Sequence, residues 1–387
     1  MADKPSMVYL DNNATTELSQ DVAGVVMDMV LHNIYGNPSS KHEVGEKVRT
    51  IIDAARYGVA QSLGCSSEEI IFTSGGTEAN NLALRGVYYP DDTRPSDLII
   101  SGGEHASVYA TAMDIAGEDR IRQIPILPNG SLDMDFAERL ITEDVVLVSV
   151  MLSNNITGNI YPIKEIVRLA HDRGALVHCD AVQAYGKIPI NVRDLGVDLL
   201  SISGHKAHAL PGVGALYIRK GIQLHPTLTG GGQESGARAG TENYVGIASL
   251  ATVANDITRR GGNMESGLRD VFEKGLLKRI PNVIVNGVES QRVPNTSSIT
   301  FKGVHSASML TALSEQGIYA SAGSACSSGT AKPPRTLISM GMSEEDALST
   351  IRFSFSSMSK IMDVALAVEA CVKCAETLRQ GAESENT

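Results

Sequence analysis

Short, continuous apolar runs alternate with helix-spaced segments over roughly residues 20 to 220 of the chain. Continuous apolar runs are typical of strands that are buried on both faces of a parallel sheet. The runs predict strands at 69–74, 97–101, 145–151, 176–180 and 198–203, and the segments between them predict helices at 42–63, 77–87, 105–116 and 163–173. This order predicts βαβ units and a mostly parallel sheet with helices on both faces. Ligands bind at the carboxyl ends of the strands in such a sheet.

The pattern changes after the glycine-rich segment 229–243. Longer helices are expected at 243–258, 264–277 and 306–316, strands near 283–286 and 297–301, a loop of small residues at 320–330, and a last helix near 361–380 with a frayed tail beyond it. This second half indicates a smaller α+β lobe that is joined by the N-terminal segment. The predicted domains are 16–259 for the large domain, and 1–15 with 260–387 for the small one.

Composition narrows the class of protein. A chain of 387 residues exceeds the size at which one core keeps growing, and a formal charge of −11 without a Lys/Arg block argues against a nucleic-acid partner. The N-terminus lacks the apolar core of a signal peptide, and no apolar run approaches the length of a membrane span. Five cysteines in a chain of this length make no disulfide framework. We therefore expect a cytoplasmic protein with no membrane partner.

A lysine, Lys206, follows the predicted strand 198–203 in the stretch SISGHK. Burial would lower the pKa of its amine and make it a nucleophile for a carbonyl, whereas a lysine that reaches solvent would be inert. Asp180 ends the preceding predicted strand, where it could pair with the ring nitrogen of a pyridinium cofactor or simply cap a helix. Gln183 could reach the same ring or be exposed.

Two further segments offer groups for a phosphate and a ring. The sequence TSGGTEANN (73–81) places two glycines before a helix that Thr77 opens, which suits an anion but also an ordinary capped turn. Ser203 and His205 flank the candidate lysine and could add donors. His105 lies at a predicted helix start, where it could stack on an aromatic ring and pass protons, or act as a cap.

Cys326 lies among small residues in YASAGSACSSGTAKPP, a setting that exposes a thiol, although a cysteine can also behave as a small apolar residue. Cys371 and Cys374 form a C-x-x-C on the last helix, which we interpret as helix packing. The nine histidines show no metal-ligand spacing. No metal site is expected.

Taken together, these segments closely resemble the NifS/IscS-type cysteine desulfurases, in the class V aminotransferase group with the pyridoxal phosphate (PLP) fold type I. The similar segments follow the family's order along nearly the whole chain. They are YLDNNATT (9–16), YGNPSS (35–40), TSGGTEANN (73–81), EH (104–105), NN (154–155), DAVQ (180–183), SGHK (203–206), GGGQE (230–234), GSACSSG (323–329) and IRFSFS (351–356).

The resemblance implies a role for each matching residue. Lys206 would carry PLP as a Schiff base, with Asp180 on its pyridine nitrogen and Gln183 on its phenolic oxygen, while His105 would stack on the ring and transfer protons. The remaining implied site residues are Gly76, Thr77, Ser203 and His205 for the phosphate, Thr241 reaching the phosphate from the other subunit of a homodimer, Arg352 for the substrate carboxylate, Asn155 beside both cofactor and substrate, and Cys326 as the nucleophile.

The implied activity is conversion of L-cysteine to L-alanine, with the sulfur passing to Cys326 as a persulfide and then to an acceptor or iron–sulfur scaffold protein. A selenocysteine lyase or another PLP-dependent C–S lyase is the alternative enzyme, and a non-catalytic assembly platform is an alternative of another class. The chain departs from the usual family pattern at Ala209, Leu210 and Pro211, at Ile156 and at Ser235.

Overall fold

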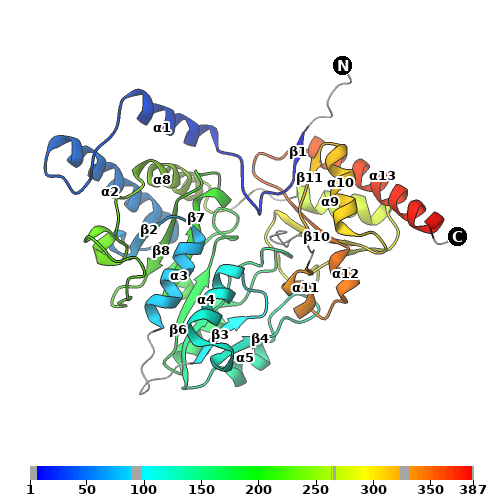
Figure 1. Cartoon of the computed structure of the whole chain (residues 1–387), viewed down its shortest axis with the longest axis horizontal. Helices are drawn as coiled ribbons and strands as arrows, with labels where there is room; N and C mark the ends of the chain where they lie inside the picture. Colours follow the sequence, from blue (N-terminus) through cyan, green and yellow to red (C-terminus); the bar gives the residue numbers. More distant parts are fainter. Residues whose placement is uncertain (1–6, 89–96, 263, 265–266, 323–331, 386–387) are drawn as a thin grey trace.

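The computed structural model describes residues 7–88, 97–262, 264, 267–322 and 332–385 (Figure 1). Its central element is a seven-stranded sheet with the order β2-β8-β7-β6-β5-β3-β4. All neighbouring pairs from β7 to β4 are parallel, whereas β8 is antiparallel to both β2 and β7. The strands are β2 Ile70–Thr73, β3 Asp97–Ser101, β4 Ile121–Ile124, β5 Val145–Ser149, β6 Leu176–Asp180, β7 Leu199–Ser203 and β8 Gly214–Ile218. The predicted mostly parallel sheet is confirmed.

Helices cover both faces of this sheet, as the continuous apolar strands require. One hydrophobic cluster joins the strands to α1, α2, α5, α6 and α8, and a second joins the other face to α3 and α4. The helices are α1 Gln20–Leu31, α2 Glu43–Leu63, α3 Gly76–Val87, α4 Ala106–Ala116, α5 Met134–Leu140, α6 Ile163–His171, α7 Val192–Leu195 and α8 Tyr244–Arg259. Predicted and observed boundaries of the four early helices agree within a few residues.

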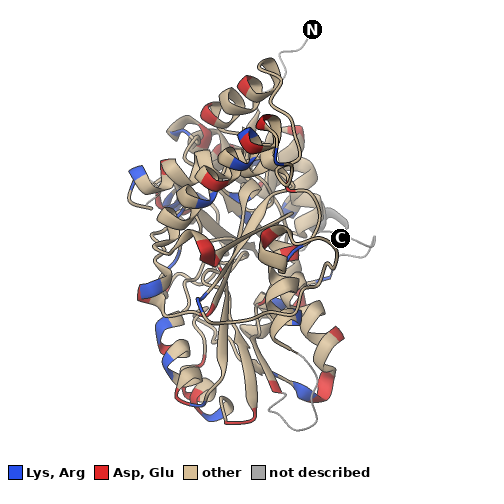
Figure 2. Ribbon diagram, turned by 90° about the vertical axis from the view of Figure 1, so that its left-hand side faces the viewer, with Lys and Arg blue, Asp and Glu red and all other residues tan. Residues whose placement is uncertain are grey.

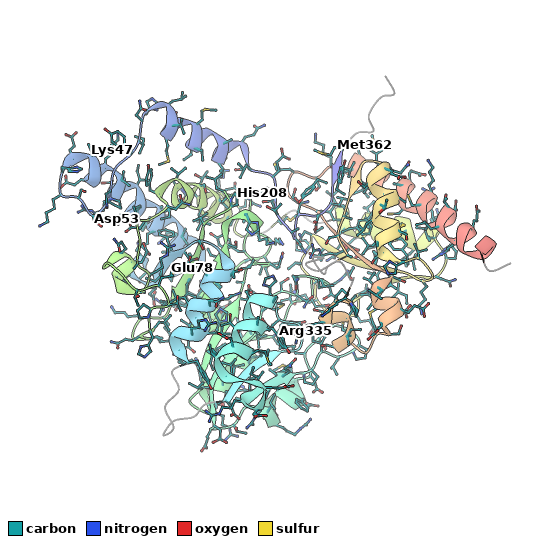
Figure 3. All side chains as sticks on the ribbon, viewed as in Figure 1. Lys47, Asp53, Glu78, His208, Arg335 and Met362 are labelled. Carbon is teal, nitrogen blue, oxygen red and sulfur yellow. The ribbon has the colours of Figure 1, made fainter. Side chains whose placement is uncertain are left out.

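A third hydrophobic cluster lies in a separate, smaller unit on the right of Figure 1, and Figure 3 shows the side chains of this unit in the same view. Its antiparallel sheet has the order β12-β10-β9, and a parallel pair joins β1 to β11. Its elements are β1 Val8–Tyr9, α9 Leu268–Arg279, β9 Val283–Val285, β10 Thr296–Phe301, α10 Ser306–Glu315, β11 Ile318–Tyr319, α11 Arg335–Ser339, α12 Glu344–Leu348, β12 Thr350–Ser354 and α13 Ile361–Glu385. The N-terminal segment packs with the C-terminal third of the chain. The exact domain bounds at 15/16 and 259/260 stay a prediction.

Two expectations about helix ends were wrong. The last helix does not fray at 381 but continues to Glu385, because the alanine and glutamate residues there favour a helix and Gly381 alone does not end it. The helix expected from 264 begins only at Leu268, because Gly267 adopts a φ of 121° that a helix excludes.

Acidic and basic residues are interspersed along the ribbon in the view of Figure 2. Within the described residues, none of the helices has the length and hydropathy that crossing a membrane would need.

Candidate active site

The carboxyl ends of β6 and β7 and the start of α3 meet at one edge of the large sheet. Here a Cβ atom built on Gly76 would lie 2.7 Å from Val182 Cγ2 and 3.4 Å from Ser203 Cβ. A larger residue at this position would require the Val182 side chain to move. The backbone N–H groups of the first turn of α3 have no acceptors inside the helix, so Gly76 and Thr77 offer donors beside the Ser203 hydroxyl. The arrangement suits a phosphate group.

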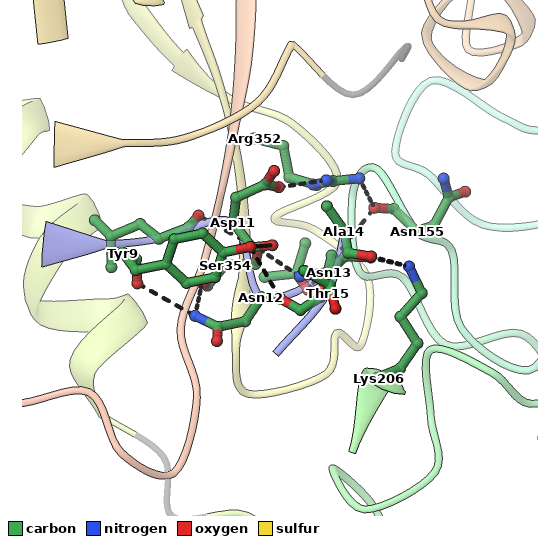
Figure 4. A network of polar contacts seen from close by, with 12 residues as sticks. Tyr9, Asp11, Asn12, Asn13, Ala14, Thr15, Asn155, Lys206, Arg352 and Ser354 are labelled. Carbon is green, nitrogen blue, oxygen red and sulfur yellow. Dashed lines mark hydrogen bonds and ion pairs between the residues drawn. The ribbon is translucent and has the colours of Figure 1, made fainter. Parts of the chain in front are cut away.

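Lys206 ends the short 3-10 helix Gly204–Lys206 that follows β7, and its side chain is partly buried. Its Nζ donates to two backbone carbonyl oxygens, at 2.8 Å to Asn13 and 2.5 Å to Ala14 (Figure 4). Burial, followed by the positive charge of Arg352, lowers the pKa of this amine from 10.5 to about 8, although two nearby carboxylates oppose the shift. The amine is therefore much more often neutral than that of an ordinary lysine, which is what attack on a carbonyl requires.

Arg352 reaches the same place from β12 of the smaller unit, and it is 5 % exposed. Its Nη2 donates to Asp11 Oδ1 at 2.7 Å and its Nη1 donates to the carbonyl oxygen of Asn155 at 3.1 Å (Figure 4). Its Nε is buried without a hydrogen-bond partner in the part of the chain that the structure describes. A buried guanidinium with a spare donor is suited to a small anion such as a carboxylate. Asn155 is half-buried and lies beside the guanidinium, and its role toward cofactor and substrate stays a prediction.

Asn13 connects the two units at this point, and it is 2 % exposed. Its side-chain amide donates to Thr296 Oγ1 at 2.9 Å and to the carbonyl oxygen of Asn155 at 3.3 Å. Its own carbonyl oxygen accepts from Gln183 Nε2 at 2.9 Å and from Lys206. The N-terminal segment Asp11–Ala14 is thus part of the site, in contact with groups from both sheets.

Asp180 and His105 are joined by hydrogen bonds through two further residues. Asp180 Oδ2 accepts from Asn80 Nδ2 at 2.8 Å, and the same Nδ2 donates to Ser107 Oγ at 2.9 Å. Ser107 Oγ lies 2.8 Å from His105 Nδ1, which also accepts the Ser107 backbone N–H. Since that N–H can only donate, a neutral His105 carries its proton on Nε2. His105 is therefore the N-cap of α4, one of the two roles expected for it, and its exposed ring can in addition serve a ligand.

Two residues expected near the phosphate have other neighbours in the single chain. The His205 ring lies against the N-terminal segment, with Nδ1 3.2 Å from Thr15 Oγ1, and burial lowers its pKa to about 4. Thr241 is exposed on the loop before α8, next to Glu242, which lines a cavity of about 570 Å³ with Arg56 and Glu234. A contact of Thr241 with the phosphate of another subunit stays a prediction.

Three of the five cysteines were singled out from the sequence. Cys326 lies outside the described residues. Cys371 and Cys374 are buried on α13 in the hydrophobic cluster of the smaller unit, and burial raises the pKa of both thiols, so the interpretation as packing residues fits. Among the described residues, no group of three or more His, Cys, Asp or Glu side chains could hold a metal ion.

Three residues at the site were given no role from the sequence, although Asn13 and Glu104 belong to motifs that were noticed. Glu104 accepts from Ser101 Oγ at 2.5 Å and from the Met151 backbone N–H at 2.8 Å, and burial raises its pKa to about 8. Lys187 is buried and donates to both Asn13 and Gln183. Lys187 lies in AYGKIPI, where an exposed lysine can also occur, and Glu104 follows two glycines, so neither position carried a signal of its burial.

Comparison with known proteins agrees with this geometry. The model of the class V aminotransferases matches residues 8–366. A cysteine desulfurase from a Nostoc species is 40 % identical over 378 residues, which are 97 % of this chain and 94 % of the relative. The chain belongs to the cysteine desulfurases. Among solved structures, a NifS-like protein superposes with a TM-score of 0.88 at 32 % identity, covering 96 % of this chain and 100 % of its own. A structure described as SspA in complex with cysteine has a TM-score of 0.80 at 28 % identity, covering 92 % and 100 %.

Cysteine desulfurases of this class depend on PLP, and the residues present fit that cofactor. The close packing of Gly76 against Val182 and Ser203 leaves backbone N–H donors for a phosphate. The amine of Lys206 has a lowered pKa, which suits Schiff-base formation. Asp180 presents a buried carboxylate that could pair with a pyridinium nitrogen. The predicted fold class, family and cofactor are thereby confirmed.

Proposed function

We propose that this chain is an L-cysteine desulfurase that transfers the substrate sulfur to Cys326 and releases L-alanine. The observation that carries the proposal is a connected set of contacts: the Lys206 amine donates to the Asn13 carbonyl oxygen, and the Asn13 side chain donates to the same Asn155 carbonyl oxygen that accepts from the Arg352 guanidinium. A nucleophilic amine beside an anion-binding guanidinium suits a substrate that has both an amino group and a carboxylate. The complex of SspA with cysteine supports the choice of amino acid.

The proposed cofactor contacts follow the sequence analysis. Lys206 would hold PLP, Asp180 would pair with its ring nitrogen, Gln183 would donate to its phenolic oxygen, and His105 would contact its ring. PLP supplies the electron sink that makes the α-proton acidic and the carbon–sulfur bond labile. The proposed phosphate ligands are Gly76, Thr77, Ser203, His205 and, from the other subunit of a homodimer, Thr241.

The residues of the chain bind the substrate and move protons. Arg352 binds the substrate carboxylate, and the Asn155 carbonyl that accepts from Nη1 orients the guanidinium. The Lys206 amine, when it is free, rests on the carbonyl oxygens of Asn13 and Ala14, and its lowered pKa lets it take a proton from the substrate α-carbon. The Nε2 proton of His105 is held in place because Nδ1 accepts from Ser107.

Sulfur transfer needs no external oxidant. The Cys326 thiolate attacks the substrate sulfur, so an S–S bond forms while the C–S bond breaks. The carbon keeps the electron pair of the C–S bond and takes up a proton, which gives alanine and an enzyme persulfide. Ser321, five residues before Cys326, pairs with the Arg352 backbone at 2.7 and 3.2 Å. Five residues span at most about 17 Å, which limits how far Cys326 can lie from Ser321.

The persulfide implies a sulfur-acceptor or iron–sulfur scaffold protein as the partner, and a reducing compartment such as the cytoplasm. Free thiols at Cys65, Cys179, Cys371 and Cys374 are consistent with such a compartment.

Mass spectrometry of the protein after incubation with L-cysteine tests the proposal. We expect a sulfur adduct on Cys326 and an equal amount of alanine. Cys326→Ala should abolish sulfide release, while the yellow colour of the bound cofactor remains, because the cofactor contacts do not involve the thiol. A variant that still releases sulfide would show a lyase that works without a persulfide and would overturn the proposal.

A further inference from the structure

Lys187 is a buried amine whose hydrogen-bond partners are neutral. It follows β6 and is 5 % exposed. Its Nζ donates to Gln183 Oε1 at 2.7 Å and to Asn13 Oδ1 at 2.9 Å. Within the described part of the chain, no carboxylate lies within ion-pair distance of this amine. A lysine buried in this way is uncommon, because the charged form loses its hydration without gaining a counter-ion.

The contact decides which way the Gln183 amide points. A protonated lysine has donors only, so the atom that faces it is the Gln183 oxygen. The Nε2 group is therefore turned the other way, where it donates to the Asn13 carbonyl oxygen at 2.9 Å beside the Lys206 amine. A flipped amide would place two N–H groups against the lysine and lose both bonds. Lys187 thus fixes the donor end of Gln183 toward the site.

The same amine fixes Asn13, whose Oδ1 accepts from Lys187 and also from Asn295 Nδ2 at 3.0 Å. The Asn13 Nδ2 group is then free to donate to Thr296 and Asn155. One buried amine therefore sets the orientation of two amides, one from each side of the site.

The charges around Lys187 make a lysine at this position energetically unfavourable. Burial, Lys206 and Arg352 all act to lower its pKa, so two cations face it within the same site. An apolar side chain of similar length would fill the space without this desolvation penalty, which means that packing alone does not explain a lysine here.

We propose that Lys187 is a positioning residue that holds the Gln183 amide with its NH₂ group toward the phenolic oxygen of the bound cofactor. This inference rests on the proposed function, since that function assigns the phenolic oxygen to Gln183. A donor at the phenolic oxygen favours the yellow form of the cofactor, in which this oxygen is negatively charged. A carbonyl oxygen in its place would favour the protonated, colourless form.

Absorbance of the purified holoprotein tests the proposal. Lys187→Met keeps the length of the side chain and removes its donors. We expect the ratio of colourless to yellow cofactor to rise about fivefold, the equivalent of one hydrogen bond of about 1 kcal/mol. Lys164→Met, which removes an exposed lysine from α6, is the matched control and should leave the ratio unchanged.

A second pair of variants separates positioning from other effects. In a Gln183→Leu background, Lys187→Met should change the ratio no further, because there is no amide left to orient. In cofactor-free protein, the losses in melting temperature from the two substitutions should not add, because they remove the same hydrogen bond.

Three results would overturn the proposal. If Lys187→Met leaves the colourless-to-yellow ratio unchanged but lowers the melting temperature, the lysine is purely structural. If Lys187→Met changes the ratio equally in the Gln183→Leu background, the lysine acts directly on the cofactor. If the protein binds no PLP, this inference and the proposed function are refuted together. A protein that shows the shifted ratio but no persulfide would refute only the proposed function.

Discussion

The amine of Lys206 should titrate far below an ordinary lysine, and two neighbouring charges should move its pKa in opposite directions. The structure lowers this pKa from 10.5 to about 8, mainly by burial. At about pH 7 the neutral fraction is then roughly 300 times that of an ordinary lysine. Arg352 lowers the pKa and Asp11 raises it, although these two side chains form one ion pair of 2.7 Å.

Two charge-neutralising variants use this opposition. Arg352→Gln removes the cation and should raise the Lys206 pKa, whereas Asp11→Asn removes the carboxylate and should lower it. Each shift should be on the order of half to one pKa unit, the size of a single charge effect at a partly buried site. General damage to the fold would shift the Lys206 pKa in the same direction in both variants. The opposite directions of the two pKa shifts are therefore the informative result.

Schiff-base trapping measures this pKa at one residue. Cofactor-free protein is mixed with pyridoxal phosphate at a series of pH values, reduced with borohydride after a short time, and digested, and the modified Lys206 peptide is counted by mass spectrometry. Exposed lysines such as Lys164 serve as internal references in the same digest. The reasoning would be refuted if Lys206 reacted with the pH dependence of the exposed lysines, or if both variants shifted it in the same direction.

Two further predictions concern buried carboxylates. Because the pKa of Glu104 rises from 4.5 to about 8 on folding, the folded state holds a proton that the unfolded state has lost, so stability should fall as pH rises between these values. Urea unfolding should show that the unfolding free energy of the unchanged protein falls by roughly 5 kcal/mol more than that of Glu104→Gln across that pH range. Equal pH dependence in both proteins would contradict Glu104 as the origin of the loss. Arg56→Met should lower the unfolding free energy by about 3 kcal/mol, because Glu234, which Arg56 holds at 2.7 and 2.8 Å, is left buried and unpaired. Adding Glu234→Gln should recover part of that loss in thermal unfolding, and a double variant that melts no higher than Arg56→Met would contradict the explanation.

Much of the site could be predicted because it lies where strands end. Asp180, Ser203 and Lys206 end or follow strands whose apolar runs are evident in the sequence, and parallel strands bring their carboxyl ends to one edge. The start of α3 was evident as well, because two glycines follow the apolar run of β2. These are local patterns, and the chemistry of each side chain follows from its place at that edge.

Other features depended on contacts between distant segments. The antiparallel direction of β8 and the pairing of Arg352 with Asp11, 341 positions apart, leave no local pattern. Lys187 could not be distinguished from an exposed lysine, because its burial depends on Asn13 and Gln183 folding over it.

The layered α/β architecture, the sheet edge proposed for the chemistry and the family could therefore be predicted from local patterns, because apolar runs and residue types follow the order of the chain. The entry of Asp11–Ala14 into the site and the contact of one buried amine with two amides became evident only in the folded chain. The reason is physical: pKa values and amide orientations depend on desolvation and on neighbouring charges and donors, and these are set by groups that folding brings together from positions far apart.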